Sequence, residues 1–248
     1  KNIADAVHAY GIPLIVDEAH GAHFGFSPEF PENATRLGAD AVIMSVHKTL
    51  PAFTQTALLH LCSDRITEKK VAQFLGIYET SSPSYILMAG IEKSLQIIEK
   101  DREMLFAAYS RRLAEFRDKT KNLKTLQVLQ PSDFSKQEAF SFDPGKLLIL
   151  TGNSMSGQAL QEILLREYGL QMEMASGNYV VAMTSIMDTD EGFARLSDAL
   201  ECIDGTVRKK EETSEISPRE IYREQKTVMT IDQALDAEQK TVRLEEAT

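Results

Sequence analysis

The sequence predicts an α/β fold, with part of a mostly parallel sheet followed by a smaller α+β domain. Short apolar runs alternate with helical patterns over roughly the first half of the chain, which is typical of α/β proteins. After residue 122 the order becomes β–β–α–β–β–α, which indicates a small α+β unit. We therefore expect domains at residues 1–121 and 122–204, and a charged linker or the start of a truncated domain at 205–248.

The first elements carry the patterns of a helix and three buried strands. Residues 2–9 have apolar positions at helical spacing, and Gly11 ends that helix. Residues 12–16 form a short continuous apolar run, which predicts a strand buried on both faces. Similar runs predict strands at residues 41–45 and 57–62.

Loops and helices follow these strands. The loop at residues 21–31 is rich in Gly, Phe and Pro, and we expect it to lie over a pocket mouth. Residues 33–37 predict a short helix or turn, and 66–75 a longer helix. A polar loop ended by a proline then leads into a long helix at 86–120. Its apolar positions recur at roughly helical spacing: Leu87, Ile91, Leu95, Ile98, Leu105 and Leu113.

The second domain is predicted to contain four strands and two helices. The strands are expected at residues 123–129, 146–150, 172–174 and 179–183, and the helices at 156–168 and 190–203. Gly169 is positioned to end the first of these helices. Beyond Gly205 the chain is highly charged, with few apolar residues before 228–231.

The composition is that of an ordinary globular protein. Of the 248 residues, 43% are hydrophobic and 26% charged, and the net charge of -10 without a basic stripe argues against nucleic-acid binding. No apolar run is long enough to span a membrane, and we expect a cytoplasmic protein. Cys62 and Cys202 are predicted to be free thiols. Both ends of the sequence lie inside apparent elements, so we expect a piece of a longer protein.

Two residues at strand ends suggest the chemistry. Asp17 follows the first apolar strand, and Lys48 follows the second within SVHKT, 31 residues later. Carboxyl ends of strands in an open α/β sheet share one rim, so both side chains point there. A pyridoxal 5'-phosphate (PLP) enzyme needs a lysine for a Schiff base with the cofactor and a carboxylate for the protonated pyridine nitrogen. Glu18 has the wrong alternation and is the second choice for the carboxylate.

Other polar residues near this pair could complete a cofactor site. Ser45 could donate a hydroxyl to the phosphate, His47 could contact the phosphate or a substrate carboxylate, and His20 could reach the ring or its phenolic oxygen. Asp17 and Lys48 also have simpler interpretations. An Asp after a strand is often a helix N-cap or turn residue, and a Lys there is usually a solvated surface residue. His20 and His23 have metal-ligand spacing, but without further ligands nearby no metal site is expected.

Three segments resemble one enzyme family. Residues 17–24 (DEAHGAHF), 45–52 (SVHKTLPA) and 80–85 (TSSPSY) are similar to the Orn/Lys/Arg decarboxylases of the aspartate-aminotransferase-like fold, fold type I. The likeness covers about residues 1–110, and residues 143–203 follow it less sharply. It implies that residues 1–121 are the C-terminal part of the PLP-binding large domain. The implied reaction converts a basic amino acid to a diamine or agmatine, feeding polyamine synthesis.

The resemblance also implies individual roles. Lys48 would be the Schiff-base lysine, Asp17 would pair with the pyridine nitrogen, and His20 would lie near the phenolic oxygen. Ser45 and His47 would contact phosphate or substrate, and Glu173 would contact the substrate. Ser81 would reach the phosphate of a neighbouring subunit's cofactor, which implies a homodimer or higher homo-oligomer with a shared active site.

The chain lacks one part of the family pattern. No Gly/Ser/Thr-rich phosphate loop precedes Lys1, so we expect the isolated chain to have an incomplete site. Two alternatives remain open. The parent protein could be another fold type I enzyme, such as an aminotransferase or lyase, although Arg166 and Arg195 occupy no obvious pocket position for a substrate carboxylate. The chain could also be a non-catalytic fragment that acts only in dimerisation.

Overall fold

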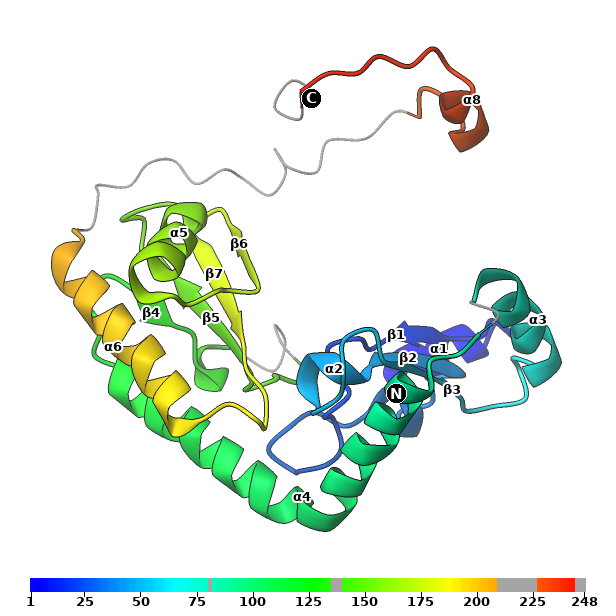
Figure 1. Ribbon diagram of the computed structural model, residues 1–248, viewed down its shortest axis with the longest axis horizontal. Coiled ribbons are helices and arrows are strands. Elements are labelled where there is room, and N and C mark those ends of the chain that lie inside the picture. Colours follow the sequence, from blue (N-terminus) through cyan, green and yellow to red (C-terminus); the bar gives the residue numbers. More distant parts are fainter. Residues whose placement is uncertain (80–81, 135–139, 209–226, 244–248) are drawn as a thin grey trace. The chain divides into compact units, whose positions relative to one another are not determined.

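The computed structural model describes residues 1–79, 82–134, 140–208 and 227–243 (Figure 1). The chain divides into a compact unit at Lys1–Lys210 and a second unit at Glu211–Thr248. Within the first unit lie a three-stranded and a four-stranded sheet. The predicted mixed α/β architecture is therefore confirmed, whereas the predicted boundary at residue 121 stays a prediction.

The first sheet has the order β1-β2-β3. Its strands are β1 (Ile15–Asp17), β2 (Ala41–Ser45) and β3 (Ala57–Leu61). β1 runs parallel to β2, and β3 pairs antiparallel with β2. One face, which includes Val42 and Met44, is buried against the rest of the unit. The helices and turns around the sheet are α1 (Asn2–His8), η1 (Ala34–Arg36), α2 (Val46–Thr49) and α3 (Glu68–Tyr78).

The expectation that residues 12–16 form a strand buried on both faces is wrong. β1 begins only at Ile15 and is an edge strand of the described sheet. Ile15 is 60% exposed, and Ile43 and Leu59 on the same face are also exposed. Among the strand residues on this face only Ala41 is buried, so an apolar run that predicts two-sided burial is covered mainly on one side.

Asp40 joins the elements around the first sheet. Its buried carboxylate accepts hydrogen bonds from the Leu14 backbone N–H and from His8 Nε2, each at 2.7 Å, and from the Ser63 hydroxyl. Burial alone would raise the pKa of Asp40, but the bonds from Ser63, Leu14 and His8 outweigh it and hold the pKa well below its usual range. This carboxylate therefore fixes α1 and the start of β1 to the end of β3.

The long helix α4 (Tyr85–Thr120) runs from the first sheet to the second (Figure 1). Ser84 caps its N-terminus by accepting the Leu87 N–H. Its C-terminal half packs on α6 (Asp190–Thr206), where the Phe116 and Phe193 rings meet edge to face with centroids 6.1 Å apart. Of the six predicted apolar positions, only Ile98 and Leu113 are buried.

The second sheet has the order β4-β5-β7-β6 and is antiparallel throughout. Its strands are β4 (Gln127–Val128), β5 (Lys146–Leu150), β7 (Tyr179–Met183) and β6 (Met174–Ser176). Helix α5 (Gly157–Tyr168) packs on β6 and β7 and ends at Gly169 in the left-handed conformation, as predicted. A short turn of helix, η2 (Pro131–Asp133), follows β4.

The strand predicted at residues 123–129 is shorter than expected. The Asp204 carboxylate accepts the backbone N–H groups of Lys124, Thr125 and Leu126 at 2.7–2.8 Å. These donors are therefore engaged by α6, and the ladder with β5 is reduced to Gln127 and Val128, followed by one bond from the Leu129 N–H to the Leu148 carbonyl at 2.9 Å. The sixth strand is also displaced, because β6 begins at Met174 and not at Met172, which is buried in the core.

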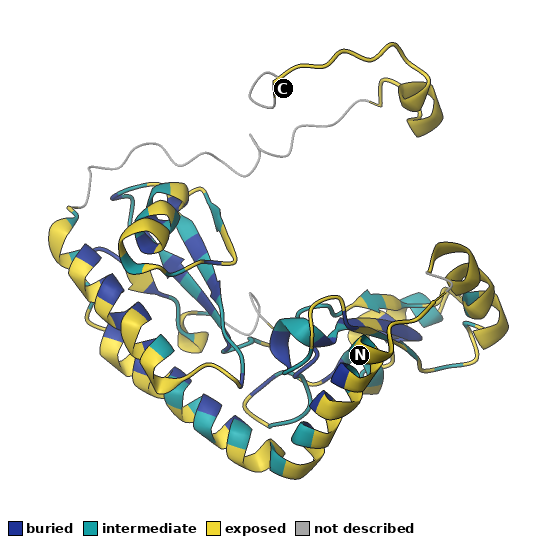
Figure 2. Ribbon diagram, in the orientation of Figure 1, coloured by how far each residue is buried: buried dark blue, intermediate teal, exposed yellow. Residues whose placement is uncertain are grey.

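Many residues of the helices are exposed to solvent, as the yellow segments of the ribbon show (Figure 2). No residue of α3 is buried, and Cys62 and Cys202 are exposed free thiols. In the second unit, α8 (Ile231–Leu235) begins with a capping box between Thr230 and Gln233, and Val228 and Ile231 are exposed. Among the described residues, no helix has the length and apolar content needed to cross a membrane.

Candidate active site

The segment that carries Lys48 is fixed to the end of the first sheet. β2 passes directly into α2, where Val46 and Thr49 are buried and anchor the turn. The carbonyl of Thr56 accepts the Val46 backbone N–H at 3.0 Å and lies 3.0 Å from His47 Nδ1. The half-buried Lys48 therefore projects from a short, well-anchored helix at the carboxyl end of β2.

Lys48 contacts His20 from the neighbouring loop. Lys48 Nζ and His20 Nε2 are 3.0 Å apart. The loop turns tightly, with bonds from Gly21 N to Glu18 O at 2.8 Å and from Phe24 N to Gly21 O at 2.9 Å. A Cβ at Gly21 would lie 2.5 Å from Glu18 Cγ and 2.6 Å from Phe24 Cδ2, so any other residue there would displace these side chains.

The surroundings of His20 favour its neutral form. Burial and the nearby Lys48 and Lys146 lower the pKa of His20, and they outweigh Glu173 and Asp17, which raise it. A neutral imidazole with a free lone pair on Nε2 can accept a hydrogen bond from the Lys48 ammonium. The electrostatics and the 3.0 Å contact are therefore consistent with each other.

Glu173 reaches this pair from the second sheet. Its Oε1 lies 3.9 Å from His20 Nε2, and both side chains are about 40% exposed. The Glu173 backbone N–H bonds to Val181 O at 2.9 Å, just before β6 begins. Three of the predicted site residues, Lys48, His20 and Glu173, thus come together although they are far apart in the sequence.

Asp17 and Ser45 lie on one face of the first sheet. Asp17 pairs with Ile43 in register, and Ser45 is two residues further along β2, so both side chains share the largely open face, on which Asp17 is exposed and Ser45 half-buried. A carboxylate that pairs strongly with a pyridine nitrogen is expected to be buried, but in this chain Asp17 is exposed and its Oδ1 accepts the Ala19 N–H at 3.0 Å.

Glu18, the second choice for the carboxylate, has a different partner from Asp17. Glu18 is engaged away from this face, because its Oε1 accepts the Ala34 N–H at 3.0 Å at the start of η1. Burial raises the pKa of Glu18, and the Ala34 bond only partly offsets that rise.

Ser81 lies outside the described residues. Within the described ranges, no three His, Cys, Asp or Glu side chains form a group that could hold a metal ion.

Sequence reasoning missed a polar cluster beside the site. His23 Nε2 lies 3.3 Å from Asp143 Oδ1, and Lys146 Nζ lies 3.3 Å from Asp143 Oδ2. The only sequence signal was the DPGK stretch at residues 143–146, which opens the family-like part of the second domain. The long sequence separation between His23 and Asp143 hid their contact.

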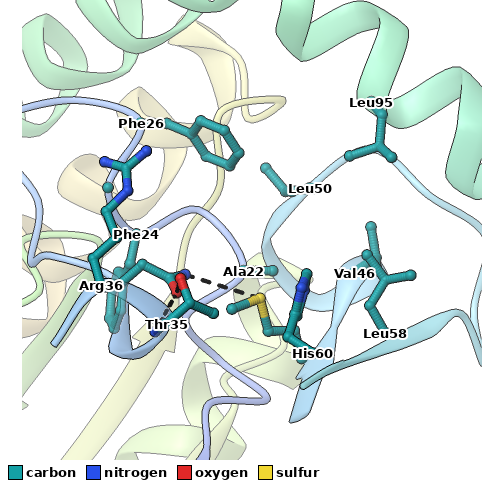
Figure 3. Close-up of a pocket in the computed structure, with 13 residues that line it drawn as sticks. Ala22, Phe24, Phe26, Thr35, Arg36, Val46, Leu50, Leu58, His60 and Leu95 are labelled. Carbon is teal, nitrogen blue, oxygen red and sulfur yellow. Dashed lines mark hydrogen bonds between the residues drawn. The ribbon is translucent and has the colours of Figure 1, made fainter. Parts of the chain in front are cut away.

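An apolar cavity of about 190 Å³ lies on the buried side of the first sheet (Figure 3). Phe24 and Phe26 of the predicted pocket loop line it, together with Leu58 and His60 of β3 and Leu95 of α4. Neither Lys48 nor His20 lines this cavity. The segment after β1 therefore contributes His20 to the polar cluster, whereas Phe24 and Phe26 of the loop line a separate apolar space.

The sequence matches the family model "Orn/Lys/Arg decarboxylase, major domain" over residues 1–191. The chain belongs to the Orn/Lys/Arg decarboxylase family. Enzymes of this family are PLP-dependent, so PLP is the cofactor to test against the site.

Curated relatives agree with the family assignment. The chain is 36% identical over 181 residues to the uncharacterized protein YaaO of Bacillus subtilis, covering 72% of this chain and 37% of that protein. It is 25% identical over 201 residues to an arginine decarboxylase of the same species, covering 81% and 41%. The chain thus spans less than half the length of these relatives.

Solved structures show the same fold. A constitutive lysine decarboxylase of E. coli superposes with a TM-score of 0.61 at 19% identity, covering 77% of this chain and 33% of that one. An alanine–glyoxylate aminotransferase from Nostoc sp. also gives 0.61, at 16% identity, covering 82% and 56%. At these identities the likeness establishes the fold alone, and both kinds of enzyme share it.

The donor set at the end of the first sheet fits PLP. A lysine, an imidazole, a carboxylate and a hydroxyl come from the carboxyl ends of β1 and β2 and the segments after them. The buried Thr49 hydroxyl, beside Lys48, has no partner among the described residues and could bond to a further group. A lysine with an adjacent carboxylate and hydroxyls is the combination that an aldehyde, a pyridine nitrogen and a phosphate require.

Proposed function

We propose that the full-length protein is a PLP-dependent decarboxylase that converts arginine, lysine or ornithine to agmatine or a diamine and carbon dioxide. The cluster of Lys48, His20 and Glu173 is the observation that carries this proposal, because it joins a cofactor-type lysine to an acidic group from another sheet. We also propose that residues 1–121 belong to the PLP-binding large domain and 122–204 to the small domain.

PLP, when bound, supplies the electron sink for the pair released as the bond from Cα to the carboxylate breaks. Lys48 would hold the cofactor through Nζ, and Asp17 would keep the proton on its pyridine nitrogen by charge pairing. His20 holds a lone pair at Nε2, 3.0 Å from Lys48 Nζ, and can accept a proton from that nitrogen.

Further residues would orient the cofactor and the substrate. The His47 ring is held by the Thr56 carbonyl, which leaves Nε2 to contact phosphate or substrate. Ser45 would donate its hydroxyl to the phosphate. Ser81 would reach the cofactor of a neighbouring subunit, so the active enzyme would be a homodimer or a higher homo-oligomer with a shared site.

Glu173 supports a basic substrate. Its carboxylate is about 40% exposed and lies 3.9 Å from His20, where it can pair with a cationic group. Arg166 and Arg195, the candidates for an aminotransferase-type carboxylate contact, are engaged elsewhere. Arg166 pairs with Glu162 at 2.7 Å, and Arg195 donates to the Tyr168 carbonyl at 2.9 Å.

A substrate panel tests the reaction. The full-length protein with PLP is given arginine, lysine or ornithine, and carbon dioxide is measured. We expect release from at least one of the three, and none from the Lys48→Ala variant. Keto-acid formation without carbon dioxide would make the protein an aminotransferase, and no turnover of any kind would contradict the proposal.

Borohydride reduction tests the site independently of the substrate. Reduction of the full-length protein with PLP, followed by peptide mass mapping, should place a pyridoxyl group on Lys48. Lys146 serves as the internal control, because it is the other lysine beside His20. An adduct on Lys146, or on neither lysine, would remove the assigned role of Lys48.

A further inference from the structure

Two contacts connect the 17–24 loop to the second sheet. His20 Nε2 lies 3.9 Å from Glu173 Oε1, and His23 Nε2 lies 3.3 Å from Asp143 Oδ1. The first contact is about 40% exposed on both sides, whereas the second is nearly buried, with side-chain exposures of 2% and 11%. The buried contact is therefore better placed to hold the two parts together.

His23 is held firmly on the loop side. Its ring centroid lies 4.7 Å from that of Phe24 and 5.2 Å from that of Phe30, and Phe30 stacks on Tyr109 of α4 at 5.3 Å. The buried Nδ1 has no hydrogen-bond partner among the described residues. Asp143 is thus the partner that fixes the direction of the ring, through Nε2.

Asp143 is held equally firmly on the second side. Its Oδ1 accepts the Gly145 N–H at 2.9 Å, and the Pro144 carbonyl accepts a hydrogen bond from Arg117 at 2.8 Å. The Gly145 carbonyl accepts the Thr184 hydroxyl at 2.8 Å. The turn that carries Asp143 is therefore tied to α4 and to the end of β7, next to the strand pair that holds Glu173.

We propose that Asp143 is a positioning residue, which through its bond to His23 keeps Glu173 opposite His20. Glu173 is exposed, so packing of its own side chain does not determine where it lies. Its position follows from the second sheet, and the sheet is tied to the 17–24 loop by Asp143 and His23. The inference rests on the proposed function for the catalytic meaning of Glu173, but the geometric coupling can be tested without the reaction.

The ionisation of His20 provides the reporter. The charged groups around it are Lys48 and Asp17 from the first sheet and its α2 turn, and Lys146 and Glu173 from the second. Because a carboxylate favours the imidazolium, Glu173→Gln should lower the pKa of His20. The decrease depends on the distance between the two side chains, so it measures whether Glu173 is held near His20.

A double-mutant cycle tests the coupling in the full-length apo-protein. The pKa of His20 is measured by NMR titration with and without Glu173→Gln, in the natural background and in Asp143→Leu. We expect the decrease caused by Glu173→Gln to fall to less than half in the Asp143→Leu background. His23→Phe, which keeps the ring contacts but removes the bond, should give the same loss and serves if Asp143→Leu does not fold.

Asp204→Asn is the matched control, since Asp204 also accepts backbone N–H groups in the second domain, and its hydrogen bonds within the described part of the chain go to residues 124–126 rather than to the 17–24 loop. In the Asp204→Asn background, Glu173→Gln should lower the pKa of His20 as much as it does in the natural background. An undiminished decrease in both Asp143→Leu and His23→Phe would overturn the proposal. A failed substrate panel with an intact cycle would instead count against the decarboxylase assignment and leave the positioning role standing.

Discussion

At the scale of single residues, the contact between Lys48 and His20 favours the neutral form of His20. Two nitrogens 3.0 Å apart share one proton, and the ammonium donates it into the lone pair of a neutral imidazole. Burial, Lys48 and Lys146 lower the pKa of His20 and so favour that state. As the pH falls, His20 becomes protonated and the bond is lost, so the pair is formed only above the lowered pKa.

The variant Lys48→Met tests this pair. Methionine keeps most of the volume but removes the cation, so the pKa of His20 should rise. NMR titration of the full-length apo-protein measures the shift. Lys100→Met, on the exposed surface of α4, should leave the pKa of His20 unchanged. An unchanged pKa in Lys48→Met would mean that the two side chains are not in contact in solution.

Residue types and spacing predict Lys48 and His20, whereas Glu173 follows only from the resemblance to the family. Lys48 and His20 stand in the segments most similar to the family, and Glu173 was proposed from the same resemblance. His23 and Asp143 could not be paired, because 120 positions separate them and no local pattern links them. The exposure of Asp17 was also missed, since a strand-end pattern does not show which faces of the sheet are covered.

At the scale of elements, local patterns located β2, β5 and β7 at their observed bounds, because apolar runs between turns determine such strands. They failed for β4, where Asp204 takes the N–H groups that a ladder would use. Side chains that compete for backbone donors are set by tertiary contacts, so propensity alone does not reveal them.

The junction between α5 and β7 gives an element-scale prediction. A Cβ on Gly157 would lie 2.1 Å from the Tyr179 carbonyl oxygen, so Gly157→Ala must displace the helix from the strand. We expect the free energy of unfolding to fall by about 2 kcal/mol or more. Chemical denaturation of the full-length protein measures the change.

Gly205→Ala is the matched control for that substitution. Gly205 lies near the end of α6, and a Cβ there would meet no atom within 4 Å. Its only expected effect is the helix propensity of alanine, a gain of up to about 1 kcal/mol. Equal stabilities of the two variants would show that α5 can shift without cost and that its close approach to β7 does not matter.

At the scale of the whole molecule, the open face of the first sheet leaves part of the candidate site exposed to solvent. Ile15, Ile43 and Leu59 are exposed on it, together with Asp17. An exposed carboxylate pairs weakly with a cation, because water screens the charges, and such pairs contribute about 1 kcal/mol or less. Asp17 can therefore hold a pyridine nitrogen strongly only where this face is covered.

We therefore expect the isolated 248-residue chain to bind PLP at least about tenfold more weakly than the full-length protein, and to release little carbon dioxide from any of the three basic amino acids. Titration of the cofactor absorbance and a carbon dioxide assay at equal protein concentrations measure both quantities.

The substitution Asp17→Asn should weaken PLP binding by the full-length protein much more than by the isolated chain, because only a covered carboxylate has a strong pair to lose. Turnover by the isolated chain close to that of the full-length protein would contradict this dependence and would mean that the exposed sheet face takes no part in forming the site.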